Sequence, residues 1–349
     1  MNFRKRIAID LGTTSVLVYS RSKGVILNEP SVVAVDRFTD RVIAVGEEAK
    51  KMLGRTPGNI VAERPLKDGV ISNYHYTEQM LKYFIKATVG SRLFKPDLII
   101  CVPSGANQVQ KRAVKQAGLK SGANDVFLIE EPLAAAIGSG IDISENSGHM
   151  IIDIGGGTTD IAVIAKGGIV VADSIKIAGD ETDKAIIEYV RQNFNVIIGE
   201  KMAEDIKLSI GTLDAVQEEF EAKGRNLYTG LPETIILTQE DISKALEKII
   251  EEIANAAKRV ISKTPPELVA DLYENGAMLT GGGALIRDMK DTIQDIIKIN
   301  VFIPQNPISS VVIGTGRSLN WISKIDSFES NRLEMTRKYV EQRENLRRR

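Results

Sequence analysis

The chain has 349 residues, 43% of them hydrophobic and 26% charged, a composition typical of about two globular domains with well-filled cores. Its 45 lysines and arginines are balanced by 46 aspartates and glutamates, so the charge gives no reason to expect nucleic acid as a partner. The single cysteine, Cys101, excludes an internal disulfide framework, and two histidines without a cysteine cluster argue against a histidine-based zinc site or a Ser-His-Asp triad.

The N-terminal segment enters a strand directly. MNFRKR lacks the apolar core of a signal peptide, and no apolar run reaches the roughly 18 residues of a membrane span, so we expect an intracellular protein. Residues 7–19 (IAIDLGTTSVLVY) predict a strand, a turn at Gly12 and a second strand, with Asp10 before the turn. A dinucleotide fold or a P-loop would continue into a helix instead, and no GxxxxGK[ST] is present.

The rest of the first half alternates helices with strands. Residues 77–89 show helical spacing of apolar side chains and are followed by a strand at 97–105 (DLIICVPSG) and a helix near 108–118. The segment FLIEEPLAAAIGSG predicts a strand that ends at Glu130 and Glu131, and then a helix beginning at Pro132, where the missing N–H costs nothing.

A second glycine turn opens the other half. Residues 151–164 (IIDIGGGTTDIAVI) repeat the plan of the first hairpin, with Asp153 in the place of Asp10. Such turns let backbone amides approach a ligand, so the pair predicts a phosphate cradle with a carboxylate on each side. Ordinary hairpin turns, capped by the two aspartates, are the alternative.

The second half then continues with helices, a hairpin and a third glycine cluster. We expect helices near 183–194 and 203–210, a polar hairpin at 223–238 and a long helix at about 240–262. Residues 277–289 (AMLTGGGALIRDM) predict a short strand, three glycines and a helix whose N-terminus faces a polar or anionic group. Two α/β halves of similar plan imply duplicated lobes around a central nucleotide cleft.

Several motifs together resemble a known superfamily. The two hairpins, VPSG, LIEEPLAAAIG, GDETD and LTGGGAL are similar to those of actin, sugar kinases and heat-shock chaperones. RPLKDGVI, IGEKMAEDIKLSIG, GRNLYTGLP, KTPPELVADL and GTGRSL further resemble, in order and spacing, the bacterial actins of the MreB family. This resemblance implies an actin-like α/β fold: a lobe at 1–145 with a small subdomain at about 30–75, a lobe at 146–325 with one at about 182–255, and a basic tail at 326–349.

The resemblance also implies a site for ATP or ADP with Mg²⁺. Asp10 and Asp153 would hold the water shell of the ion, because Mg²⁺ prefers oxygen ligands and keeps several waters. For Glu204 and Lys207, placed near the adenine, a plain surface ion pair is the alternative. The nucleotide contacts are expected at Gly12, Thr13, Thr14, Gly155, Gly156, Gly157 and Thr159 for the phosphates, at Gly179, Asp180 and Glu181 for the ribose, and at Glu204, Lys207, Gly281, Gly282, Gly283 and Ala284 for the adenine.

The catalytic residues implied are Glu131, which orients the attacking water, and Thr158, which assists it. Glu130 is interpreted as a structural neighbour, since only one of two adjacent side chains at a strand end can point into the cleft. Two positions depart from the family pattern: Thr182 stands where relatives usually have methionine, and Ala178 where many have glycine.

The same family forms membrane-associated filaments that guide cell shape, so the resemblance implies self-association in the cytoplasm at the inner face of the membrane, with other cytoskeletal or morphogenesis proteins as further partners. Leu93 and Phe94 are the expected membrane contact, and a connector packed inward is the alternative. The tail, rich in arginine, would add attraction to anionic lipid or remain solvated. A sugar or acetate kinase and a chaperone ATPase are the competing functions within the superfamily.

Overall fold

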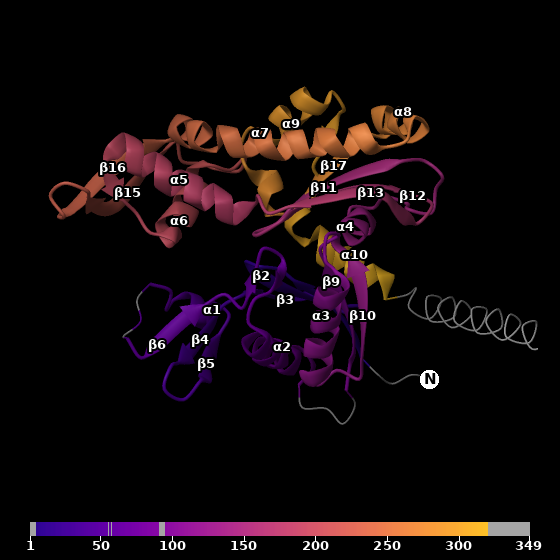
Figure 1. The fold of residues 1–349 in the computed structure, drawn as a ribbon, viewed down its shortest axis with the longest axis horizontal. Helices are drawn as coiled ribbons and strands as arrows, with labels where there is room; N and C mark the ends of the chain where they lie inside the picture. Colours follow the sequence, from indigo (N-terminus) through magenta and orange to yellow (C-terminus); the bar gives the residue numbers. More distant parts are fainter. Residues whose placement is uncertain (1–4, 55, 57, 91–94, 320–349) are drawn as a thin grey trace, which may run out of the picture.

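The computed structural model describes residues 5–319 apart from 55, 57 and 91–94. Two lobes face each other in Figure 1, each built on a sheet. The first sheet has the order β10-β9-β1-β2-β3. Strands β1, β2 and β3 form an antiparallel meander, and β9 and β10 extend the sheet beyond β1 as parallel strands. These strands are β1 (Arg6–Leu11), β2 (Ser15–Ser20), β3 (Gly24–Pro30), β9 (Asp97–Val102) and β10 (Asp125–Glu130).

The second lobe repeats this topology. Its sheet has the order β13-β12-β11-β17-β18, again with an antiparallel meander followed by two parallel strands. The predicted duplication is therefore visible in strand order as well as in the two glycine turns. The strands are β11 (His149–Ile154), β12 (Thr159–Ala165), β13 (Gly168–Ile175), β17 (Ala277–Thr280) and β18 (Val301–Phe302).

Helices cover the two sheets on both faces (Figure 1). Two of them begin with a capping box, in which Asn107 or Thr238 accepts from the third helical amide. The helices are α2 (Tyr74–Val89), α3 (Gln108–Lys120), α4 (Glu131–Gly138), α5 (Gly179–Phe194), α6 (Glu200–Ile210), α7 (Gln239–Lys263), α8 (Pro266–Asn275), α9 (Met289–Ile297) and α10 (Ser310–Ser318).

Smaller elements extend each lobe at one end of the molecule (Figure 1). In the first lobe they are β4 (Val33–Asp36), β5 (Arg41–Val45), α1 (Glu47–Lys50) and β6 (Ile60–Glu63), followed by the two-stranded turn of β7 (Leu66–Lys67) and β8 (Val70–Ile71). In the second lobe they are β14 (Val196–Ile197), β15 (Glu219–Asn226) and β16 (Pro232–Thr238).

Two helices each pack against the sheet of the other lobe. α4 follows β10 of the first sheet but packs against β11 and β12 of the second, and α10 packs back on β1, β2 and β9. The two helices touch at glycines: a Cβ on Gly138 would lie 1.8 Å from the carbonyl oxygen of Ser310, and one on Gly314 would lie 1.8 Å from that of Ala134. Only glycine permits this approach, so the pair forms a close-packed link between the lobes.

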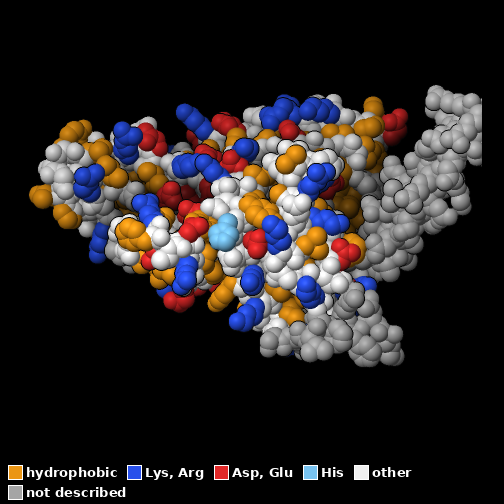
Figure 2. Space-filling view, turned by 60° about the horizontal axis from the view of Figure 1, so that its bottom comes forward, with side chains coloured by type: hydrophobic (Ala, Val, Ile, Leu, Met, Phe, Trp, Pro, Cys, Tyr) orange, Lys and Arg blue, Asp and Glu red, His pale blue; other side chains and the backbone are white. Residues whose placement is uncertain are grey.

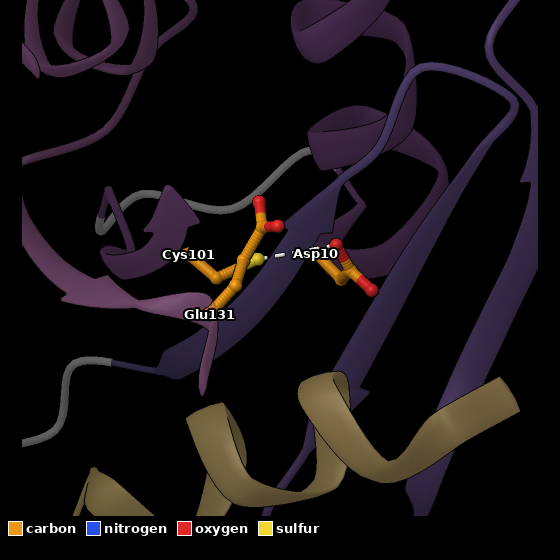
Figure 3. Close-up of side chains that lie close together, drawn as sticks. All are labelled: Asp10, Cys101 and Glu131. Carbon is orange, nitrogen blue, oxygen red and sulfur yellow. Dashed lines mark hydrogen bonds between the residues drawn. The ribbon is translucent and has the colours of Figure 1, made fainter. Parts of the chain in front are cut away.

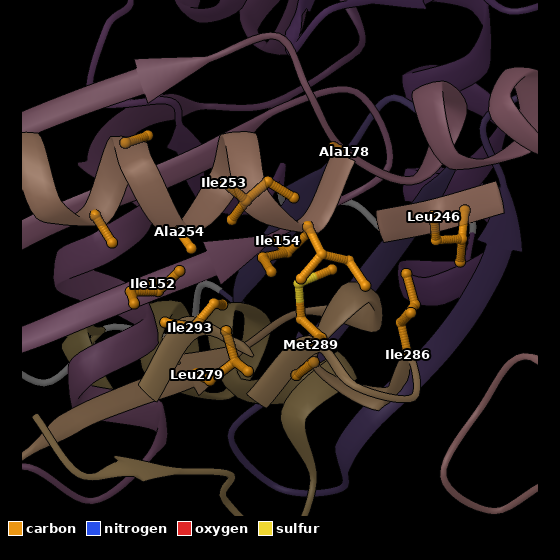
Figure 4. Close-up of a cluster of buried hydrophobic side chains, with 14 of the residues drawn as sticks. Ile152, Ile154, Ala178, Leu246, Ile253, Ala254, Leu279, Ile286, Met289 and Ile293 are labelled. Carbon is orange, nitrogen blue, oxygen red and sulfur yellow. The ribbon is translucent and has the colours of Figure 1, made fainter. Parts of the chain in front are cut away.

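The core of the second lobe lies between its sheet and α7 and α9 (Figure 4). Ile152 and Ile154 of β11 meet Ile253 of α7 and Ile293 of α9, and all four are fully buried. Each such side chain contributes roughly 1.5–3 kcal/mol when removed from water. Helices on both faces of a sheet explain why its strands are nearly continuous apolar runs.

The predicted helices and the polar hairpin are confirmed, with one correction at the third glycine cluster. There the chain forms the short 3₁₀ helix η1 (Gly282–Leu285), and α9 begins only at Met289. The prediction of an α-helix starting directly after the glycines is therefore wrong. A second 3₁₀ helix, η2 (Pro307–Ser309), precedes α10. In the described ranges, no helix has the length and apolarity to cross a membrane.

Candidate nucleotide-binding cleft

A cavity of about 230 Å³ lies between the lobes, where the two glycine hairpins meet. It is bounded by α5 and α6 on one side and by the third glycine cluster on another. The structure thus brings together segments that are far apart in sequence. Most of the predicted site residues line this cavity: Asp10, Gly12, Thr13, Thr14, Glu131, Asp153, Gly155, Gly156, Gly157, Thr158, Gly179, Asp180, Glu204, Lys207, Gly281, Gly282 and Gly283.

Three predicted contacts are not on the cavity wall. Thr159 is fully buried and donates its hydroxyl to the carbonyl oxygen of Ile177 at 2.6 Å, since its side chain points to the opposite face of the strand from those of its neighbours. Glu181 pairs with Lys184 one turn further along α5. Ala284 is fully buried in the core of the second lobe. Their predicted contacts with a nucleotide have no support in this structure.

The two hairpins approach so closely that glycine is required. A Cβ on Gly156 would lie 1.7 Å from Oγ1 of Thr14, and one on Gly157 would lie 2.6 Å from Oγ1 of Thr13. Any larger residue would push the lobes apart.

Part of the predicted amide cradle is already used within the hairpins. The amide of Gly12 donates to the carbonyl oxygen of Ser15 (3.1 Å), and that of Gly155 to the carbonyl oxygen of Thr158 (2.9 Å). In this structure these two amides stabilise the turns, so their prediction as phosphate donors is corrected. The described residues give no hydrogen-bond partner to the amides of the other cradle residues, Thr13, Thr14, Gly156 and Gly157.

Asp10 and Asp153 are carboxylates on opposite lobes, of which Asp153 is buried and Asp10 half-buried. Burial raises the pKa of Asp10 to about 6 and that of Asp153 to about 7. Thr280 partly offsets this at Asp153 by donating its hydroxyl to Oδ1 at 2.6 Å. Burial disfavours an isolated carboxylate, whereas a nearby cation favours its ionised form. Two such groups facing one cavity therefore suit a hydrated cation with oxygen ligands, such as Mg²⁺.

Cys101 is a site neighbour that the sequence did not indicate. Its Sγ donates to Oδ1 of Asp10 at 3.1 Å, and Glu131 lies beside both, with the ligand atoms of all three within 4.8 Å (Figure 3). Burial and the charges of Asp10 and Glu131 raise the pKa of the thiol well above its usual value. A neutral thiol is a poor ligand for a hard cation, so Cys101 acts here as a hydrogen-bond donor.

Glu131 is the first residue of α4, and one of its carboxylate oxygens lies within 4.8 Å of the ligand atoms of Asp10 and Cys101 (Figure 3). Burial, and then the charges of Asp160, Asp10 and Asp153, raise its pKa well above the usual value. Its neighbour Glu130 occupies the N-cap position without a capping bond from its side chain, and accepts instead from Nζ of Lys111 at 2.9 Å, in agreement with a structural role. A carboxyl held near the phosphate cradle with a raised pKa suits a residue that accepts a proton from water.

The far end of the cavity contains Glu204 and Lys207 of α6, which do not pair with each other. Lys207 lies 2.6 Å from Oδ1 of Asp183, and Glu204 lies 3.0 Å from Lys50 on the other lobe. The alternative of a simple pair between them is therefore wrong. Thr182, one of the departures from the family pattern, accepts from Nζ of Lys207 at 3.2 Å and so helps to position it.

Two more ion pairs join the lobes around the cavity. Arg64 lies 2.9 Å from Oδ1 of Asp180, and Lys176 lies 3.2 Å from Oδ2 of Asp68. The pairing of these residues, like that of Lys50, was not predicted, although Arg64 and Asp68 belong to the motif RPLKDGVI. Elsewhere on the surface, Figure 2 shows basic and acidic side chains interspersed over the visible face, without a large field of one sign.

The predicted membrane contact, Leu93 and Phe94, lies outside the described residues, as does the basic tail at 326–349.

Comparisons with known proteins agree with this geometry. The sequence profile of the MreB/Mbl protein family matches residues 4–327. The cell shape-determining protein Mbl of Bacillus subtilis (strain 168) is 48% identical over 326 residues, covering 93% of this chain and 98% of the relative. The cell shape-determining protein MreB of Escherichia coli (strain K12) is 45% identical over 328 residues, covering 92% and 94%.

Solved structures give the same result for the fold. MreB5 of Spiroplasma citri bound to AMPPNP superposes with a TM-score of 0.89 at 36% identity, covering 94% of this chain and all of that one. A chain of the MamK double helical filament gives a TM-score of 0.74 at 21% identity, covering 90% and 99%, which supports the fold alone. The predicted actin-like fold is thus confirmed, and the chain belongs to the MreB/Mbl family of cell shape-determining proteins.

Proposed function

We propose that this chain is a cytoskeletal ATPase that binds Mg-ATP between its lobes, polymerises into filaments at the membrane and takes part in determining cell shape. The observation that carries the proposal is the meeting of two glycine hairpins, each with an aspartate of raised pKa, in one cavity. The relative MreB5 has been solved with AMPPNP and with ADP, which supports the choice of nucleotide.

In this proposal the phosphates lie between the hairpins. The amides of Thr13, Thr14, Gly156 and Gly157 are the available donors, because those of the other two hairpin glycines are used within the turns. Asp10 and Asp153 would hold Mg²⁺ through its waters. The ion, when bound, neutralises charge on the phosphate oxygens. Glu204, Lys207 and the Gly281–Gly283 turn would surround the adenine.

Hydrolysis is assigned to Glu131 and Thr158. Glu131 orients the attacking water and accepts its proton on the carboxylate, and the hydroxyl of Thr158 holds the same water from the other lobe. Positioning supplies most of the rate in phosphoryl transfer, so residues on both lobes must be aligned at once. Hydrolysis would then favour disassembly of the filament.

Membrane association remains a proposal from the sequence. Full burial of Leu93 and Phe94 in lipid would give roughly 3–6 kcal/mol, too little to hold one monomer firmly. A filament presents many copies and would bind by avidity. Liposome co-sedimentation of a protein with both residues changed to serine tests this, because binding should fall while ATP affinity stays unchanged. Other morphogenesis proteins are further expected partners.

Electron microscopy of the purified protein with ATP, with ADP and without nucleotide, combined with phosphate-release assays, tests the main proposal. ATP-dependent filaments that release phosphate would support it. The absence of filaments over a range of protein and salt concentrations, or phosphate release only on addition of a sugar or small acid, would contradict it. Family membership does not favour the kinase and chaperone alternatives.

A further inference from the structure

Asp160 of β12 is a buried carboxylate with no part in the predicted nucleotide contacts. Only 1% of the residue is exposed. Its Oδ1 accepts two hydrogen bonds from Ser104, one from the amide (2.8 Å) and one from the hydroxyl (2.7 Å). Ser104 follows β9, so both bonds cross from the first lobe to the second.

The position of this carboxylate is costly for the fold. Its Oδ2 makes no hydrogen bond of regular geometry among the described residues, although the hydroxyls of Ser174 and Thr158 lie close enough to lower its pKa against the larger, raising effect of burial. Asp160 also faces Asp153 directly across the β11–β12 ladder, and like charges in that arrangement destabilise a sheet. A buried acid that leaves one oxygen without a regular hydrogen bond and also faces a second carboxylate calls for a functional reason rather than a structural one.

A second turn of the first lobe lies close to both the Ser104 loop and Thr158. Gly69, in the turn between β7 and β8, has a φ of +73°, and a Cβ there would lie 2.8 Å from Cγ of Pro103 and 2.9 Å from Cγ2 of Thr158. The amide of Gly69 donates to Oγ1 of Thr13 at 2.9 Å. Two segments of the first lobe, the Gly69 turn and the Pro103–Ser104 loop, therefore contact Thr158 and Asp160, which stand just before and at the beginning of β12.

The proposed water of hydrolysis depends on this arrangement. Glu131 directly follows β10 of the first sheet and Thr158 directly precedes β12 of the second, so a shift of one sheet against the other changes the distance between them. A misplacement of about 1 Å can lower a rate by about 10²-fold. The Ser104–Asp160 contact joins the two lobes two residues from Thr158.

We propose that Ser104 is a positioning residue for ATP hydrolysis, which holds Asp160, and with it Thr158, against the first lobe so that Thr158 and Glu131 share one water only when the lobes are closed. The inference rests on the proposed ATPase activity. It assigns the Ser104–Asp160 pair to coupling between lobe closure and chemistry, and assigns no contact with the nucleotide to either residue.

The test measures single-turnover phosphate release and ATP affinity in the full chain. Ser104→Ala removes the hydroxyl donor, and we expect release to slow by about 10-fold or more while affinity stays within about twofold. Ser104→Thr keeps a hydroxyl and should restore most of the rate. Ser121→Ala is the matched control: this buried serine of the same lobe donates only within that lobe, to Glu78 and Ala117. It should lower thermal stability without slowing release.

Two variants of Asp160 distinguish a role of its hydrogen bonds in positioning from a role of its negative charge. Asp160→Asn keeps an oxygen that accepts both bonds from Ser104, so it should retain the rate within about threefold, whereas Asp160→Ala should lose at least as much as Ser104→Ala. Wild-type release in Ser104→Ala, an equal loss in Ser121→Ala, or equal losses in the two Asp160 variants would each overturn the inference alone. A wild-type protein that binds ATP and never releases phosphate would instead overturn the proposed function.

Discussion

Nζ of Lys50 lies 3.0 Å from both carboxylate oxygens of Glu204, and this ion pair joins helix α1 of the first lobe to helix α6 of the second. Glu204 lines the cavity, and the side chains of Lys50 and Glu204 are 28% and 17% exposed. A nucleotide that leaves through this side of the cavity must separate the pair.

Lys50→Ala should therefore accelerate nucleotide release. Ion pairs of this exposure contribute about 0.2–1 kcal/mol, which corresponds to a rate increase of up to about fivefold. The measurement is displacement of a fluorescent ADP analogue, at low and at high salt, since salt weakens the pair and should reduce the difference. The adjacent Lys51→Ala is the control, because Lys51, which follows α1, pairs with Glu48 of that helix in the same lobe. Equal release rates in the two variants would contradict the prediction.

The nucleotide-free protein should lose stability as the pH rises from about 4 to 7. Burial raises the pKa of Asp153 to about 7 and that of Asp10 to about 6 from 3.8, so the folded state binds more protons than the unfolded chain in this window. The free energy of unfolding then decreases with rising pH, at about 1.4 kcal/mol per unit for each fully contributing group. Asp153→Asn should flatten the dependence, measured by thermal unfolding between pH 5 and 8. An unchanged slope would show that Asp153 is ionised throughout.

Glu131→Ala should separate binding from chemistry. The phosphates are assigned to other residues, so ATP affinity should stay nearly unchanged, while phosphate release should slow by about 10²-fold or more. Filaments should form and persist longer. Thr158→Ala should act in the same direction, and the double variant should show less than the product of the single effects if both residues hold one water. Wild-type turnover in Glu131→Ala would remove this residue from the mechanism.

Cys101 should be inert to alkylation in the folded protein. Burial and the neighbouring charges of Asp10 and Glu131 raise the pKa of its thiol, and the thiolate is the reactive form. Since the chain has one cysteine, intact-protein mass spectrometry reports on this residue alone. Iodoacetamide should label the urea-unfolded protein at least about 10²-fold faster than the native protein. Comparable rates would mean that the site opens readily to solvent.

Gly314→Ala should destabilise the contact between α4 and α10. The new Cβ would lie 1.8 Å from the backbone oxygen of Ala134, which cannot move without moving the helix. Overpacking of this kind costs about 1–3 kcal/mol or more, visible as a lower thermal midpoint. Gly168→Ala is the control, because a Cβ there meets no atom within 4 Å. A stable Gly314→Ala protein would indicate that the helices can separate without loss.

Much of the fold was predictable because its determinants are local. Alternating apolar residues, capping residues and glycine turns specify strands, helices and hairpins without reference to distant parts of the chain. The two aspartates and their hairpins are examples, since each stands beside its own glycines in sequence. The third glycine cluster shows where local reading fails: a glycine run followed by apolar residues does not tell a 3₁₀ turn from the start of a helix.

The sequence by itself therefore determined the elements, their duplication and the residue types around the phosphates. Only the tertiary structure decided which distant groups meet: Lys50 with Glu204 and Ser104 with Asp160 across the lobes, and Cys101 with Asp10 on neighbouring strands of the first sheet. It also decided that Thr158 lines the cavity while Thr159 does not. These contacts join residues far apart in the chain or depend on which face of a strand is turned inward, and both follow from how the two sheets pack rather than from any local pattern.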